Sequence, residues 1–231
     1  MSNSYFAFKQ FTVHQDMCAM KVGTDGTLLG AWAAPCPAEH PRILDAGTGT
    51  GLIAMMMAQR FAGAQVTGVE IDGDAAMQAK ANAAGSPFSG RIEIVNAPLQ
   101  NLADGGFDLI VCNPPYFTDS LKCPDEKRSM ARHASTLTYG ELASHAARLL
   151  AGTGILAVIV PAGSRSDMDS AAAIAGLHPR KACAVRTKAG RQPKRYMLAY
   201  SVEHSEEVCT EELIIGDDRY NIMLKDFYLA L

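Results

Sequence analysis

The residues with the clearest chemical meaning are Asn113-Pro114-Pro115-Tyr116, which directly follow the apolar run 107–112. Two consecutive prolines continue neither a strand ladder nor a helix, so a buried strand over 107–112 must end here. The side-chain oxygen of Asn113 and the carbonyl oxygen of Pro114 then form two adjacent acceptors beyond the sheet edge, with a tyrosine ring nearby. This pair suits a planar amino group that donates two hydrogen bonds. The tetrapeptide also fits an ordinary tight turn. Its position relative to the other motifs of the chain therefore has to distinguish a binding site from a turn.

A glycine-rich turn lies upstream, between a predicted strand at 42–45 and a predicted apolar helix. Gly47, Gly49 and Gly51 let the backbone approach a ligand closely and expose the N–H groups of the helix that follows. Their spacing differs from the Gly-x-Gly-x-x-Gly fingerprint of dinucleotide sites. Asp45 ends the strand, where it would repel a pyrophosphate but suits a cationic amino-acid group.

Two more predicted strands end in polar residues. The strand at 65–70 ends in Glu70, where a carboxylate accepts hydrogen bonds from ribose hydroxyls, although a solvated strand end is the alternative. The strand at 92–95 leads to Asn96 and Ala97, which could meet the edge of an adenine. Alternating strands and helices predict a parallel sheet with helices on both faces, and ligands bind beyond the carboxyl ends of such strands. All of these residues therefore converge at one edge.

The segment 1–41 carries aromatic residues at alternating positions and predicts a short strand or a flap. Lys21 and Thr24 lie beside glycines, so we expect them to cover a bound ligand, and Lys9 is a predicted substrate contact. The alternative is a plain strand that closes one side of the fold. We expect one domain, with an extension at 1–41, a core sheet at 42–202 and a packed tail at 203–231.

Composition and charge exclude several classes of protein. Hydrophobic residues make up 48% and charged residues 19% of the 231 residues, which is typical of a globular protein. No apolar run approaches the ~20 residues of a membrane span, and no secretory signal is visible, so we expect a cytoplasmic protein without membrane contact. The six cysteines lack Cys-x-x-Cys spacing, which favours reduced thiols over disulfides or a zinc site.

The net charge of −3 hides a strong segregation. Residues 170–202 contain seven basic and no acidic residues, whereas 203–218 contain seven acids. The basic block is either a solvated face or the electrostatic footprint of nucleic-acid binding. We expect Arg191, Lys194 and Arg195 to contact RNA.

The remaining patterns complete the sheet. A capping box at Thr138 starts a helix, an apolar strand follows at 155–160, and strands at 182–186 and 196–202 form an antiparallel pair. The polar stretch 117–136 has no clear periodicity.

Taken together, Asp45-x-Gly47-x-Gly49-x-Gly51, Glu70 and the Asn-Pro-Pro-Tyr corner resemble the class I S-adenosylmethionine-dependent methyltransferases that modify amino groups. The opening Phe8-Lys9-Gln10-Phe11, the stretch 18–26 and the ending 226–229 resemble more narrowly the bacterial tRNA(Val) adenine-37 N6-methyltransferases, and this likeness runs nearly end to end. Where many members of the class carry Asp, this chain has Asn96.

The resemblance implies a Rossmann-like fold with a mostly parallel seven-stranded sheet, an antiparallel end hairpin and helices on both faces. It implies a cofactor, S-adenosylmethionine, whose methionine part contacts the glycine loop and Asp45, whose ribose contacts Glu70, and whose adenine contacts Asn96 and Ala97. It also implies that Asn113 and Pro114 hold the target amine, that Tyr116 stacks on the base, and that Pro115 and Phe117 contact it. The implied partner is the tRNA anticodon loop, bound by a monomer without metal.

Three alternatives stay open. Protein glutamine N5-methyltransferases resemble the core and hold a side-chain amide at the same tetrapeptide, but carry an added N-terminal helical domain. DNA or ribosomal RNA bases are further possible targets. The third alternative is a catalytically silent cofactor-binding module that grips RNA through residues 180–195.

Overall fold

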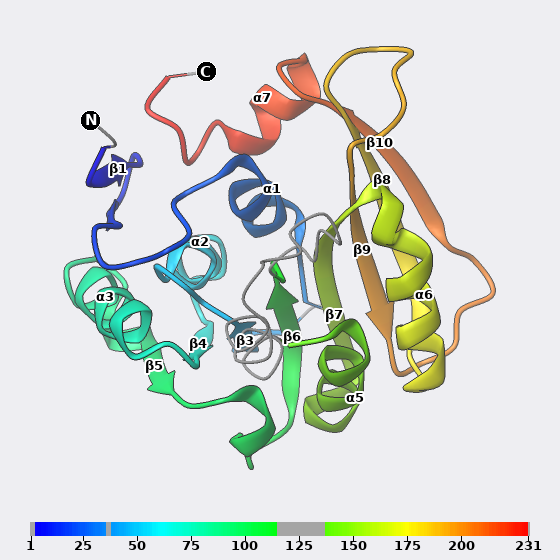
Figure 1. The fold of residues 1–231 in the computed structure, drawn as a ribbon, viewed down its shortest axis with the longest axis horizontal. Coiled ribbons are helices and arrows are strands. Elements are labelled where there is room, and N and C mark those ends of the chain that lie inside the picture. The colour runs from blue at the N-terminus through cyan, green and yellow to red at the C-terminus, as the bar shows by residue number, and fades with distance from the viewer. Residues whose placement is uncertain (1–2, 36–37, 115–136, 231) are drawn as a thin grey trace, which may run out of the picture.

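The computed structural model describes residues 3–35, 38–114 and 137–230, in which an eight-stranded sheet runs through the molecule and a two-stranded hairpin stands beside it (Figure 1). The strands are β1 (Tyr5–Ala7), β2 (Thr12–His14), β3 (Arg42–Ala46), β4 (Gln65–Glu70), β5 (Ile92–Asn96), β6 (Phe107–Cys112), β7 (Leu150–Pro161), β8 (His178–Arg186), β9 (Arg195–Ser201) and β10 (Cys209–Ile214). The α-helices are α1 (Thr24–Trp32), α2 (Leu52–Arg60), α3 (Gly73–Ala84), α5 (Tyr139–Leu149), α6 (Arg165–Ile174) and α7 (Asp218–Leu224). Short 3-10 turns cover Ser89–Arg91, Leu99–Asn101 and Ala162–Ser164.

The sheet has the order β10-β8-β9-β7-β6-β3-β4-β5. Strands β7, β6, β3, β4 and β5 are parallel, whereas β9 lies antiparallel between β7 and β8. The chain leaves β3 toward β4 and β5 on one side and later fills β6 and β7 on the other. The point between β3 and β6 is therefore the topological switch at which such sheets bind ligands. The predicted fold class is confirmed.

Strand β10 adds an eighth strand to the seven that the sequence predicts. It pairs in parallel with β8 and comes from the acidic segment. Its acids are neutralised locally, because Glu211 pairs with Lys181 and Glu212 pairs with Arg186, each at 2.9 Å.

Helices cover both faces of the sheet, and each face has its own apolar core (Figure 1). Leu28, Met56 and Leu224 from α1, α2 and α7 pack on one face, together with Leu109 and Val111 of β6. On the other face α5 and α6 pack against alternate residues of the same strands, such as Ile110 and Leu156. Strands buried on both faces must be apolar throughout, as β6 and the end of β7 are.

Side chains cap the starts of several helices. Thr138 and Glu141 form the expected capping box of α5, and the Asp72 side chain accepts a hydrogen bond from Ala75 N–H at the start of α3. Helix α1 was not expected, because glycines interrupt its sequence. Within the described ranges no helix has the length and apolarity to cross a bilayer, and no group of three His, Cys, Asp or Glu residues could hold a metal ion.

Candidate active site

The glycine turn between β3 and α2 has the backbone that its sequence requires. Gly47, Gly49 and Gly51 have φ values of 72°, 55° and 80°, a region that favours glycine. A Cβ atom added at Gly47 or Gly49 would meet nothing within 4 Å, whereas one at Gly51 would lie 3.4 Å from Ala79 of α3. The first two glycines therefore leave room for a ligand, and the third allows the turn to pack closely on α3.

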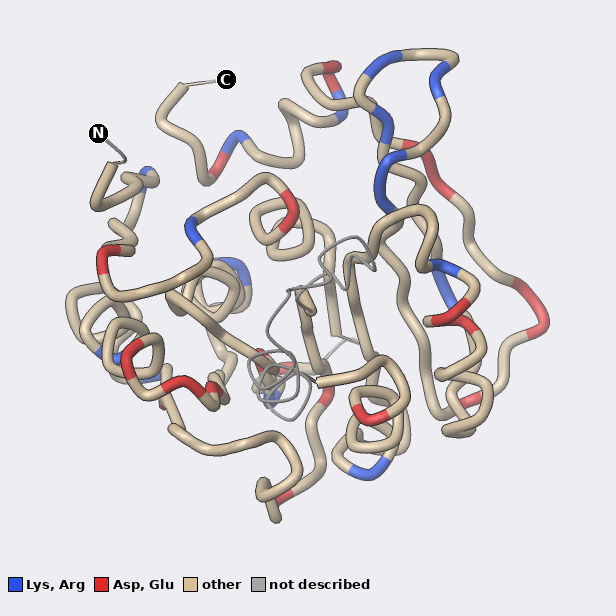
Figure 2. The backbone as a smooth tube through the Cα atoms, viewed as in Figure 1, with Lys and Arg blue, Asp and Glu red and all other residues tan. Residues whose placement is uncertain are grey.

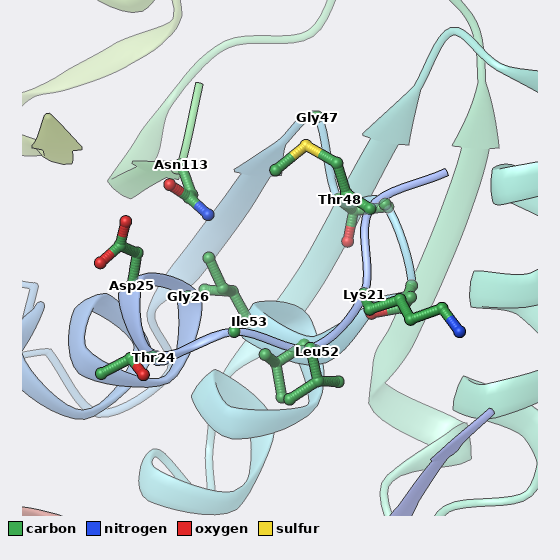
Figure 3. A pocket seen from close by; sticks show the side chains of 14 residues that line it. Lys21, Thr24, Asp25, Gly26, Gly47, Thr48, Leu52, Ile53 and Asn113 are labelled. Atoms are coloured by element: carbon green, nitrogen blue, oxygen red, sulfur yellow. The ribbon is translucent and has the colours of Figure 1, made fainter. Parts of the chain in front are cut away.

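A cavity of about 370 Å³ opens above this turn (Figure 3). Three parts of the chain line it: the glycine turn with the start of α2, the end of β6 at Asn113, and the segment 20–26. The cavity therefore lies at the switch point of the sheet. Lys21 and Thr24 belong to this lining, as the sequence predicts, but the Lys21 side chain points away from Asn113 (Figure 3).

A second cavity, of about 90 Å³, shares Gly47 with the first. It lies beyond the ends of β4 and β5, and its lining includes Val69, Glu70, Ile71 and Ala97. The two cavities are thus neighbours at the glycine turn.

Glu70 lines the second cavity and is hydrogen-bonded to the glycine turn that lines the first. Its Oε2 accepts a hydrogen bond from Gly49 N–H at 2.9 Å and its Oε1 accepts one from Asp72 N–H at 3.0 Å. The Asn96 amide instead donates to the backbone carbonyls of Glu70 and Ile71, at 2.9 and 3.2 Å, and Asn96 lies outside both cavity linings. Asn96 therefore supports the turn after β4, and its neighbour Ala97 lines the cavity.

Asp45 lies beneath the glycine turn with only 1% of its surface exposed. Its Oδ2 accepts hydrogen bonds from Thr48 Oγ1 at 2.5 Å and Ala54 N–H at 3.0 Å, while its Oδ1 has no partner among the described residues. Burial raises the pKa of Asp45 to about 7, although both hydrogen bonds oppose the shift and the Glu70 charge adds to it. A cation nearby would lower this pKa again.

The first turn of α1 forms the wall next to Asn113. A Cβ atom added at Gly26 would lie 3.8 Å from Asn113 Nδ2, and the Asp25 carboxylate lies on the same side of the cavity as the Asn113 amide (Figure 3). Asp25 Oδ2 accepts a hydrogen bond from Arg195 Nε at 2.8 Å. Sequence reasoning missed Asp25, although it directly follows Thr24 and lies in the stretch 18–26.

The other predicted contacts are more scattered. Pro115, Tyr116 and Phe117 lie outside the described residues. Lys9 donates a hydrogen bond from Nζ to Lys225 O at 2.6 Å and lines a separate hollow between the β1–β2 hairpin and α3.

Six of the seven basic residues in the block, all except Arg180, fall into two sets (Figure 2). Lys181, Arg186 and Arg195 are held by acids, the first two by β10 and the third by Asp25. The β8–β9 loop carries a second set that is exposed and forms no ion pair with a described residue: Lys188, Arg191 and Lys194.

Comparison with known proteins identifies the family. A family model, methyltransferase small domain, matches residues 27–168. The tRNA1(Val) (adenine(37)-N6)-methyltransferase of Phocaeicola vulgatus is 47% identical, and the match covers 100% of both chains. The chain belongs to this family. Relatives of the same name from Bacteroides fragilis and Tolumonas auensis are 44% and 40% identical, and these matches cover all of this chain and 100% and 99% of theirs.

Solved structures resemble this member of the tRNA1(Val) (adenine(37)-N6)-methyltransferase family only in their fold. A predicted O-methyltransferase of Agrobacterium tumefaciens has a TM-score of 0.68 at 20% identity and covers 90% of this chain and 99% of its own. A geranyl diphosphate C-methyltransferase of Streptomyces coelicolor, solved with S-adenosyl-L-homocysteine, has a TM-score of 0.54 at 13% identity, with 72% of each chain covered. These likenesses show a shared methyltransferase fold.

Proposed function

We propose that this enzyme transfers a methyl group from S-adenosylmethionine to N6 of adenine 37 in tRNA1(Val). One observation carries the proposal: Asn113, which directly follows β6, lines the same cavity as the glycine turn after β3. A ligand in that cavity is therefore within reach of a side chain suited to an amino group. The names of the full-length relatives supply the choice of adenine and of tRNA.

The two neighbouring cavities fit this cofactor. Gly47 and Gly49 leave room for it. Asp45 lies outside both cavity linings, so its unpaired Oδ1 would act on the positively charged amino-acid part through water or through the glycine turn above it. Glu70 lines the second cavity next to the glycine turn, where it would accept hydrogen bonds from ribose hydroxyls. Ala97 would border the adenine, while Asn96 would act from behind, through the carbonyls of Glu70 and Ile71. When bound, the cofactor supplies an electrophilic methyl group.

The target amine would be held by the corner at the end of β6. Asn113 Oδ1 and the Pro114 carbonyl are two acceptors for its two N–H groups, and this hold turns the nitrogen lone pair toward the methyl group. Tyr116, outside the described residues, would stack on the extruded base, which contributes about 1–3 kcal/mol to binding. We propose the neighbouring Pro115 and Phe117 as further contacts to that base.

Basic side chains would bind the phosphate groups of the tRNA. Arg191 and Lys194 of the exposed loop are the proposed phosphate contacts, with Arg195 closer to the cavity and Lys9 at the separate hollow beside α3. We propose that a single domain, acting as a monomer in the cytoplasm, binds the anticodon loop.

Labelled S-adenosylmethionine and total tRNA from a strain that lacks this protein test the proposed function. We expect label to enter tRNA as N6-methyladenosine, identified by mass analysis of the nucleosides. No transfer to tRNA, or a label on another nucleoside, would contradict the proposal. A parallel reaction with a peptide that carries a glutamine amide tests the protein-directed alternative.

A further inference from the structure

The ion pair between Asp25 and Arg195 joins two distant parts of the chain at the cavity. Asp25 lies in the first turn of α1, and Arg195 is the first residue of β9, 170 positions later. The Nε–Oδ2 distance is 2.8 Å, and the Arg195 and Asp25 side chains are only 32% and 21% exposed. An ion pair that is this short and partly buried orients its two side chains more strongly than an ion pair on an open surface.

On one side, this ion pair fixes the wall beside the predicted amine-binding residue. The residue after Asp25 is Gly26, whose added Cβ would lie 3.8 Å from Asn113 Nδ2 and 3.3 Å from Leu52. The first turn of α1 is therefore packed against the end of β6 and the start of α2. A shift of Asp25 would change the space next to Asn113.

On the other side, the pair fixes the base of the exposed basic loop. Arg195 lies opposite Pro161 of β7 in the sheet, and its Nη1 donates a hydrogen bond to Lys194 O at 2.9 Å. The Lys194 N–H in turn donates to Val185 O at 2.9 Å, which closes the loop. The guanidinium is thus oriented by the carboxylate of Asp25, which lines the cavity, and by the backbone of the loop.

We propose that Asp25 is a positioning residue for methyl transfer, which acts through Arg195. It holds the guanidinium plane beside the first turn of α1, where this plane contacts a phosphate next to the target nucleotide and seats the amine against Asn113. A planar guanidinium recognises phosphate through its Nη edge, so the orientation of the plane matters as well as the charge. This inference rests on the proposed function. It adds Asp25 to the residues involved and gives Asp25 and Arg195 separate roles.

A double-mutant cycle with tRNA tests this proposal. The variants are Asp25→Asn, Arg195→Gln and the double variant, compared by kcat and KM for tRNA and by the affinities for S-adenosylmethionine and S-adenosylhomocysteine. We expect each single variant to lower kcat/KM for tRNA by about tenfold, and the double variant to be no worse than the Arg195→Gln variant, because the two residues act as one unit. Cofactor affinities should stay near wild type, which also reports a correctly folded site.

Two further variants separate positioning from structural damage. Asp25→Glu keeps a carboxylate for Arg195 and should recover part of the loss in kcat/KM. Glu212→Gln breaks the Arg186–Glu212 pair, also 2.9 Å long but outside both cavity linings, and should match wild type.

Three results would overturn the inference. Single losses that multiply in the double variant would show that Asp25 and Arg195 act independently. A loss of S-adenosylmethionine affinity with unchanged S-adenosylhomocysteine affinity would show that Asp25 faces the cofactor charge instead. Wild-type kinetics of the Asp25→Asn variant would show that Asp25 has no role in methyl transfer. An enzyme inactive on tRNA from the start would contradict the proposed function as well, so the two failures are distinguishable.

Discussion

At the scale of single residues, Asp45 shows how burial beneath the glycine turn changes the titration of a carboxyl group. The same oxygen, Oδ2, accepts hydrogen bonds from Thr48 and Ala54, and the side chain is almost fully buried. Because burial outweighs these hydrogen bonds, the pKa of Asp45 rises to about 7, well above the ordinary value of an aspartate. In the protein without ligand this carboxyl therefore binds its proton more tightly when folded than when unfolded.

This shift predicts how the free energy of unfolding depends on pH. Between the unfolded and folded pKa values the folded state holds more protons, so the stabilising contribution of Asp45 is lost as pH rises toward 7. The Asp45→Asn variant lacks this titration. We expect wild type to lose stability relative to Asp45→Asn between pH 5 and pH 8, measured by chemical denaturation without cofactor. Parallel stability curves for the two proteins would contradict the assigned environment of Asp45.

At the scale of elements, helix α3 holds the N-terminal segment that continues into the cavity lining at 20–26. The buried Gln78 accepts a hydrogen bond from Met17 N–H at 3.2 Å. One turn later, the buried Asn82 accepts from His14 N–H and donates to the carbonyls of His14 and Thr50. Thr50 itself lines the cavity, so Asn82 links the N-terminal segment, α3 and the glycine turn.

Removing this link should weaken the cofactor site. Asn82→Ala leaves buried backbone groups unpaired, each at a cost of about 1–3 kcal/mol. We expect a lower melting temperature and an affinity for S-adenosylhomocysteine reduced by about tenfold in calorimetric titration. Asn82→Asp keeps the acceptor for His14 N–H but cannot donate to Thr50 O, so it should also bind more weakly. The exposed Asn101→Ala serves as the matched control, and equal affinities in all variants would show that the link is not needed.

The β8–β9 loop carries a separate prediction about RNA. Reversing Lys188, Arg191 and Lys194 to Glu should weaken tRNA binding and make its salt dependence shallower, because fewer counterions are released. Affinity for S-adenosylhomocysteine should not change. Arg195 is left out of this variant, since a glutamate there would face Asp25. Reversal of the exposed Lys80 on α3 provides the control. Unchanged tRNA binding by the triple variant would remove the loop from the interface.

At the scale of the whole molecule, the parallel sheet and the convergence of its strand ends could be predicted from sequence. The apolar strands at 107–112 and 155–160 and the helix caps are local signals, and topology alone brings the glycine turn and Asn113 to one edge. The cavity confirms that Lys21, Thr24 and Asn113 lie with the glycine turn. The individual roles of these residues stay predictions.

Features set by distant contacts could not be predicted. Helix α1 contains glycines that lower helix propensity, and the reason is tertiary: a Cβ at Gly30 would lie 2.5 Å from the sulfur of Met56. Strand β10 looks like a solvated acidic segment until Lys181 and Arg186 are placed beside its glutamates. The position of Asp25 could not be interpreted from sequence, because its ion-pair partner Arg195 lies 170 residues later in the chain.

The central claim is that the corner at the end of β6 holds the target amine against the methyl donor. Methyl transfer to tRNA by Asn113→Ala, measured with S-adenosylhomocysteine affinity and alongside the Asn101→Ala control, tests it most directly. We predict that Asn113→Ala binds S-adenosylhomocysteine like wild type and transfers no detectable methyl group to adenine. Normal turnover by Asn113→Ala would contradict the account.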